Sequence, residues 1–134
     1  MIHDSDGLLI AGINHYFGLK GARYEQSSPG MRAHIILVLY RQGGVPMHVS
    51  QLSRLVGCST RSDAIRVHIH YIRKALGGMH TIERIGGEYI RMTSAGFEEM
   101  HECFTDMKQR LDEALARATK NANDAFARKL TVVS

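Results

Sequence analysis

The sequence predicts an α+β fold that is mainly α, with one small β-hairpin and one long C-terminal helix. Apolar residues recur at helical spacing in several windows of the chain. Glycine pairs at Gly43-Gly44, Gly77-Gly78 and Gly86-Gly87 punctuate these windows, and β-branched, extended segments flank the third pair. A chain of 134 residues is long enough for one compact core with an appended element, but short for two full domains.

Residues 1–28 are predicted to form an N-terminal element that is helical and belongs to a dimer interface. After Ser5-Asp6, apolar residues permit a short amphipathic helix whose apolar face would cover the C-terminal helix. Gly7 and Gly12 weaken the helical pattern, and strands are the alternative. The apolar residues of this predicted helix are Leu8, Leu9, Ile10, Ile13, Tyr16 and Phe17.

A core helix is predicted after the break at Ser28-Pro29-Gly30. Its apolar side carries Ile35, Ile36, Leu39 and Tyr40, and Gly43-Gly44 ends it. Residues 45–49 look extended. Ser50 is then expected to cap a short helix over residues 51–56, which stops at Gly57.

The next predicted helix runs from Arg61 to Leu76. Ile65, Ile69, Ile72 and Leu76 recur at spacings of four, three and four, which places them on one apolar stripe. The face outside this stripe is cationic, Asp63 can favour helix initiation, and Gly77-Gly78 supplies the left-handed conformation that stops a helix. A core helix, a short helix, a turn and this helix form the order of a helix-turn-helix.

A β-hairpin is predicted directly after this helix. Residues 82–85 and 88–92 fit two strands, joined by a two-residue turn at Gly86-Gly87, since a type I′ turn requires positive φ at both central positions. An ordinary amphipathic helix with solvated charges is the alternative for the preceding segment. The hairpin favours a DNA-binding unit, in which the second helix enters a groove.

These segments resemble a known family. VHIHYIRKAL at Val67–Leu76, followed by Ile82–Ile85 and GGEY, resembles the recognition helix and wing of OmpR/PhoB-type winged-helix domains. The resemblance implies a winged helix-turn-helix over residues 29–93, with the recognition helix in the major groove and the wing near the adjacent backbone or minor groove. Asp63, Arg66, Tyr71 and Glu88 depart from the family pattern, so the resemblance implies the docking mode and no base preference.

The expected DNA contacts come from three places. The short helix and the turn after it would contact phosphates, the second helix would contact bases and phosphates, and the wing would contact the backbone. His68 is interpreted as either a phosphate contact or a packed ring. The candidate residues are Arg54, Ser59, Thr60, Arg61, Arg66, His68, His70, Tyr71, Arg73, Lys74, Arg84 and Arg91.

The C-terminal segment, residues 94–134, is predicted to be a long dimerisation helix. From Phe97 to Ala118 apolar residues recur at spacings of 3, 4, 3, 4, 3 and 4, the seam of a coiled coil, and the end from about Asn121 is expected to fray. TSAGFEEM resembles the junction before the dimerisation helix of MarR- and PadR-like regulators. Packing of the stripe on the chain's own core is the alternative. The expected interface residues are Phe97, Met100, Phe104, Met107, Leu111, Ala114 and Leu115.

Composition gives little support to other classes of function. The chain has a formal net charge of +4, which suits phosphate neutralisation but is shared by many unrelated proteins. No apolar run is long enough for a membrane span, and no basic, apolar leader begins the chain. Neither zinc-ligand spacing nor a phosphate-binding glycine loop is present, so we expect no enzyme, cofactor or metal. Cys58 and Cys103 are expected to be reduced, with a redox switch as the alternative.

The sequence thus predicts a homodimeric, sequence-specific DNA-binding transcriptional regulator. A repressor is the simpler hypothesis than an activator, because bound protein alone can occlude RNA polymerase. Its expected partners are double-stranded DNA, a second copy of the chain and, as a further candidate, RNA polymerase. Its expected location is the cytoplasm of a bacterial or phage-type system, on the nucleoid. The alternative is a winged-helix module that binds RNA polymerase or another regulator without reading DNA.

Overall fold

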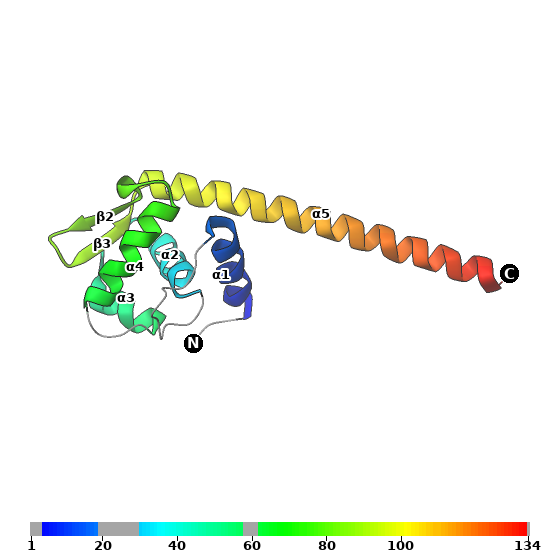
Figure 1. Cartoon of the computed structure of the whole chain (residues 1–134), viewed down its shortest axis with the longest axis horizontal. Helices are drawn as coiled ribbons and strands as arrows, with labels where there is room; N and C mark the ends of the chain where they lie inside the picture. Colours follow the sequence, from blue (N-terminus) through cyan, green and yellow to red (C-terminus); the bar gives the residue numbers. More distant parts are fainter. Residues whose placement is uncertain (1–3, 19–29, 58–61, 134) are drawn as a thin grey trace. The chain divides into compact units, whose positions relative to one another are not determined.

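The protein was analysed as a computed structural model that describes residues 4–18, 30–57 and 62–133. In these residues the chain forms five α-helices, one 3-10 helix and a three-stranded antiparallel sheet of order β1-β3-β2 (Figure 1). The prediction of an α+β, mainly α chain is confirmed. The chain divides into two compact units at Cys103, later than the predicted boundary at residue 93.

Helix α1 (Asp4–Phe17) packs against helix α2 (Met31–Arg41). Ile13 is fully buried, and both carboxylate oxygens of Asp6 accept hydrogen bonds from the guanidinium of Arg41. The helical interpretation of this segment is confirmed. Its expected place against the C-terminal helix in a dimer stays a prediction, and within the chain its main contact is with α2. Residues 1–3 and 19–29 lie outside the described parts.

Helix α3 (Val49–Val56) follows the two-residue strand β1 (Met47–His48). The helix ends at Gly57 (φ 70°), as predicted. Its N-cap differs from the prediction: the ring Nδ1 of His48 accepts a hydrogen bond from the backbone N–H of Ser50 at 3.1 Å, so His48 rather than Ser50 is the cap. An imidazole nitrogen can take this position because it accepts an otherwise unpaired N–H at the helix start.

Helix α4 (Ser62–Ala75) buries the apolar stripe that the sequence predicts. The side chains of Ile65, Ile69, Ile72 and Leu76 are at most 3% exposed. Gly77 (φ 104°) and Gly78 end the helix, where the Gly78 N–H donates to the carbonyl oxygen of Arg73 at 2.8 Å and the Gly77 N–H donates to that of Lys74. This pair of bonds is a Schellman motif, which satisfies the last carbonyls of the helix.

The hairpin follows the 3-10 helix η1 (Met79–Thr81) and consists of β2 (Ile82–Ile85) and β3 (Tyr89–Met92). The register pairs Ile85 with Tyr89, so three residues form the turn: Gly86, Gly87 and Glu88. The predicted two-residue turn is therefore wrong by one residue. Both glycines have positive φ, at 61° and 84°, as the sequence analysis requires. β1 pairs with the other edge of β3 through Met47 and Ile90.

Helix α5 spans Ser94–Val133. Its start belongs to the first unit, where Met100 is fully buried and the Phe97 ring lies 5.6 Å from that of Tyr40. For Met100 the alternative of packing on the chain's own core is correct, whereas Phe97 is half-buried and its expected dimer contact stays a prediction. The helical backbone continues past Asn121, from which the sequence predicts fraying.

Candidate nucleic-acid interface

One face of α4 is exposed over the whole described length of the helix. Arg66, His70 and Lys74 follow one another at intervals of four residues, so they form a basic row along the helix surface. Val67 and Tyr71 lie beside this row and are 49% and 44% exposed. We call these five residues the α4 face. It combines positive charge with two apolar groups, on the opposite side of the helix from the buried stripe.

Arg32 of α2 contacts two residues of α4, His68 and Tyr71. Its Nε–H donates to Nδ1 of His68 at 3.1 Å, and its guanidinium lies 4.4 Å from the centroid of the Tyr71 ring. His68 is 3% exposed and Arg32 is 8% exposed. His68 is therefore a packed ring and not a phosphate contact, which corrects that part of the predicted site. The cation–π contact fixes the orientation of Tyr71 on the surface.

Arg73 connects α4 to strand β2 of the hairpin. Its Nε–H donates to the carbonyl oxygen of Ile82 at 3.0 Å, and its side chain is half-buried beside a cavity of about 40 Å³ that Arg66 and Arg84 also line. Burial, and then the charge of Arg84, lower the pKa of Arg73. Three arginine residues border this small cavity, and its other lining residues are apolar: Val49, Ile65, Ile69 and Ile90.

The two predicted wing cations differ in their surroundings. Arg91 is paired across the strands with Glu83, which accepts from its Nη2 at 2.8 Å, so the pair is close to neutral. Arg84 is exposed, and its guanidinium donates to the carbonyl oxygen of Gly87 in the turn. Arg84 is thus the better placed of the two for an anionic partner, while Arg91 stabilises the hairpin.

The structure describes only part of the region around α3 and the following turn, where phosphate contacts are predicted. Arg54 is exposed on α3, whereas Ser59, Thr60 and Arg61 lie outside the described residues. At the sheet edge, Nε2 of His48 lies 3.0 Å from a carboxylate oxygen of Glu88, and its ring packs edge-on against Tyr89. These contacts connect β1, the start of α3 and the hairpin turn.

Sequence reasoning missed Arg32, Val67 and the connecting role of Arg73. Val67 could have been found, because it falls off the helical stripe of Ile65 and Ile69 and a valine there faces solvent. Arg32 gives no such signal, since its partners stand 36 and more positions away in the sequence. The role of Arg73 depends on where β2 lies after the glycine turn.

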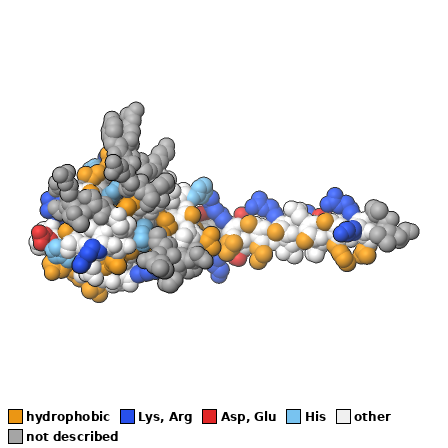
Figure 2. Space-filling view, turned by 90° about the horizontal axis from the view of Figure 1, so that it is seen from below, with side chains coloured by type: hydrophobic (Ala, Val, Ile, Leu, Met, Phe, Trp, Pro, Cys, Tyr) orange, Lys and Arg blue, Asp and Glu red, His pale blue; other side chains and the backbone are white. Residues whose placement is uncertain are grey.

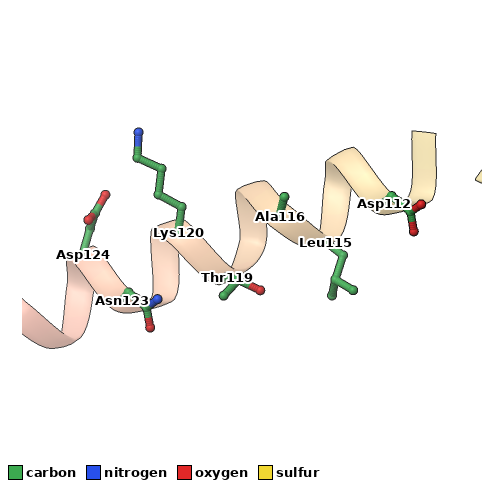
Figure 3. Close-up of a pocket in the computed structure, with 7 residues that line it drawn as sticks. All are labelled: Asp112, Leu115, Ala116, Thr119, Lys120, Asn123 and Asp124. Carbon is green, nitrogen blue, oxygen red and sulfur yellow. The ribbon is translucent and has the colours of Figure 1, made fainter. Parts of the chain in front are cut away.

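The described part of the second unit offers an exposed helix face. Leu111 and Leu115 are 68% and 64% exposed, and Ala114 is exposed too, while Phe104 and Met107 are half-buried. Figure 2 shows hydrophobic side chains exposed repeatedly along α5. A shallow hollow runs from Asp112 to Asp124, but one helix supplies all of its walls, and its side chains fan out around that helix (Figure 3).

The described residues hold neither a metal-binding cluster nor a membrane-spanning helix. No group of three or more His, Cys, Asp or Glu side chains there could hold a metal ion. In the same parts of the chain, no helix is long and apolar enough to cross a membrane. Cys103 is fully buried, and Cys58 lies in a segment that the structure does not describe.

Comparison with protein-family models, curated proteins and solved structures finds no match to this chain.

Proposed function

We propose that the chain is a winged helix-turn-helix DNA-binding regulator, with α4 as its recognition helix and the β2–β3 hairpin as its wing. The observation that carries this proposal is the α4 face, on which Arg66, His70 and Lys74 form an exposed basic row. A helix preceded by a short helix and followed by a hairpin is the arrangement in which such a face enters the major groove.

The chemistry of the α4 face suits DNA. Arginine and lysine neutralise phosphates and can donate to guanine, whereas Val67 offers an apolar contact to a thymine methyl group. Tyr71 is held in one orientation by Arg32, so its ordering cost on binding is small. Arg84, exposed on the wing, would contact a backbone phosphate between recognition helix and wing.

The regulator is proposed to act as a homodimer that occupies paired half-sites and represses by occlusion. The exposed leucines of α5 support self-association, because a row of large apolar side chains more than half exposed marks an interaction surface. A two-fold dimer then implies a palindromic target with half-sites spaced by helical turns.

Selection of bound duplexes from a random pool tests this function. We expect the selected sequences to converge on one paired motif, and we expect Arg66→Ala to relax the preference at one position of each half-site. Loss of preference with retained fold, judged by an unchanged circular dichroism spectrum, would support base contact. A pool that never converges, together with unaltered selection by Arg66→Ala, would reject sequence-specific reading.

A protein-binding module is the second candidate, and exposed apolar groups are the observation that favours it. Val67 and Tyr71 on α4, Leu55 on α3 and Tyr89 on the hairpin are 44–52% exposed. RNA polymerase or another regulator could bury such a surface. Affinity that scarcely changes with salt, combined with no binding to duplex DNA, would favour this candidate over the first.

A further inference from the structure

The second unit carries an apolar repeat of eleven residues on its exposed face. Phe104, Leu115 and Phe126 are spaced by eleven, and so are Leu111 and Ala122. Eleven residues make three helical turns plus about 20°, so both sets stay on one side of a nearly straight helix. Leu111, Leu115 and Phe126 are 64–68% exposed. The predicted seam, with its seven-residue repeat, leads instead from Ala118 to the polar Asn121. It therefore ends before Ala122 and Phe126, which the eleven-residue repeat includes.

Large and small side chains are unevenly divided along this face. The first half holds Phe104, Met107, Leu111 and Leu115, whereas the second half holds Ala118, Ala122 and Ala125 before Phe126. A parallel pair would place alanine opposite alanine and leucine opposite leucine. That arrangement leaves a thin, poorly filled second half.

An antiparallel pair fills both halves. In one register Leu111 of each copy lies opposite Ala122 of the other, and Leu115 lies opposite Ala118. The same register places Met107 opposite Phe126. Large residues then meet small ones in the central part of the pair, from Leu111 to Ala122, which lets the two backbones approach there and interdigitate their side chains. Lys129 faces Phe104 in this register, where its apolar stem can pack while the ammonium reaches solvent.

Charged side chains leave the apolar face free for pairing. At about 100° per residue, Arg110, Arg117 and Asp124 lie more than about 90° around the helix from the middle of this face. Arg110 also donates to Asp106 of its own helix at 2.9 Å. These charges therefore point to solvent whichever way the two helices run. Exposed ion pairs contribute little each, so side-chain size decides the direction of pairing.

We infer that the second unit is an antiparallel self-pairing helix, whose partner is α5 of a second copy of this chain centred between Ala116 and Arg117. This inference rests on the homodimer in the proposed function and adds its direction and register. The occupant is a second copy because the size pattern complements itself when the helix is reversed: Leu111 meets Ala122 and Leu115 meets Ala118.

Cysteine cross-linking of the whole chain tests the direction. The background carries Cys58→Ser and keeps the buried Cys103, and this background alone controls for unwanted cross-links. Leu111→Cys and Ala122→Cys are made separately in it. We expect each variant alone to stay uncross-linked under mild oxidation, and an equimolar mixture to give a disulfide-linked dimer, since position 111 meets position 122.

Each other result decides against the inference. A cross-linked dimer from Leu111→Cys alone would show a parallel pair and leave the homodimer intact. A dimeric background in which neither the single variants nor the mixture cross-link would place the dimer contact outside α5. A monomeric background by light scattering at micromolar concentration would overturn both the inference and the homodimer, while DNA binding is measured independently on the same sample.

Discussion

Gly96 in the first turn of α5 is the position at which one added carbon should do the most damage. A Cβ there would stand 2.4 Å from the carbonyl oxygen of Thr81 and 2.6 Å from Cγ of Met92. The Thr81 oxygen cannot easily retreat, because it accepts a hydrogen bond from the backbone N–H of Thr93 at 3.0 Å. Gly96→Ala therefore has to move a hydrogen-bonded backbone rather than a side chain.

The net effect of Gly96→Ala is the difference of two opposing contributions. Overpacking of a filled site costs about 1–3 kcal/mol, and alanine recovers about 1 kcal/mol of helix propensity over glycine. Contact with backbone places the cost near its upper end, so we expect the free energy of unfolding to fall by about 2 kcal/mol. That loss corresponds to a melting temperature lower by roughly 8–16 °C for a unit of this size.

Urea unfolding followed by circular dichroism measures this change as a lower midpoint at constant slope. Gly7→Ala is the matched control, because Gly7 lies in α1 and a Cβ there would meet no atom within 4 Å. The control should leave the midpoint unchanged or raise it. A Gly96→Ala midpoint equal to or above that of the wild type would show that α5 does not begin against Thr81 in this way.

Three further predictions concern the α4–hairpin connection, a histidine and the α5 face. Arg73→Ala should lower the free energy of unfolding by about 1–2 kcal/mol as well as weakening DNA binding, because it removes a charged donor to Ile82; an unchanged urea midpoint would contradict this. Burial lowers the pKa of His34 below its ordinary 6.5, so folding favours the neutral ring. The melting temperature should therefore drop as pH falls through about 6.5, and it should drop less in His34→Gln. Equal pH profiles of the melting temperature for the two proteins would contradict this. Leu115→Ser should shift the light-scattering mass toward the monomer while Lys120→Ser does not; equal masses for the two variants would count against the α5 face.

The sequence indicates the helices well where apolar periodicity and glycine stops coincide. The stripe of α4 and its Gly77-Gly78 end are predicted correctly, because helix packing and positive φ both leave local signals. The hairpin turn is one residue too short in the prediction, since Glu88 is compatible with either a turn or a strand and only the pairing of Ile85 with Tyr89 decides.

The candidate site is predictable in its outline and not in its internal contacts. Exposure of Arg66, His70 and Lys74 follows from the helical stripe alone. The burial of His68 does not, because it depends on Arg32 of another helix. The predicted dimer seam fails at Met100 for a similar reason: Met100 has the spacing of a seam, but its own unit buries it completely.

Salt dependence of binding to duplex DNA, measured by fluorescence anisotropy on the whole chain, tests most directly whether the α4 face binds phosphate. We predict that affinity falls steeply and linearly on a log–log plot as salt rises, and that Lys74→Ala reduces the slope by about one. Lys120→Ala removes the same charge from α5 and should leave the slope unchanged. Absence of duplex binding at low salt, or equal slopes for the two variants, would contradict recognition through this face.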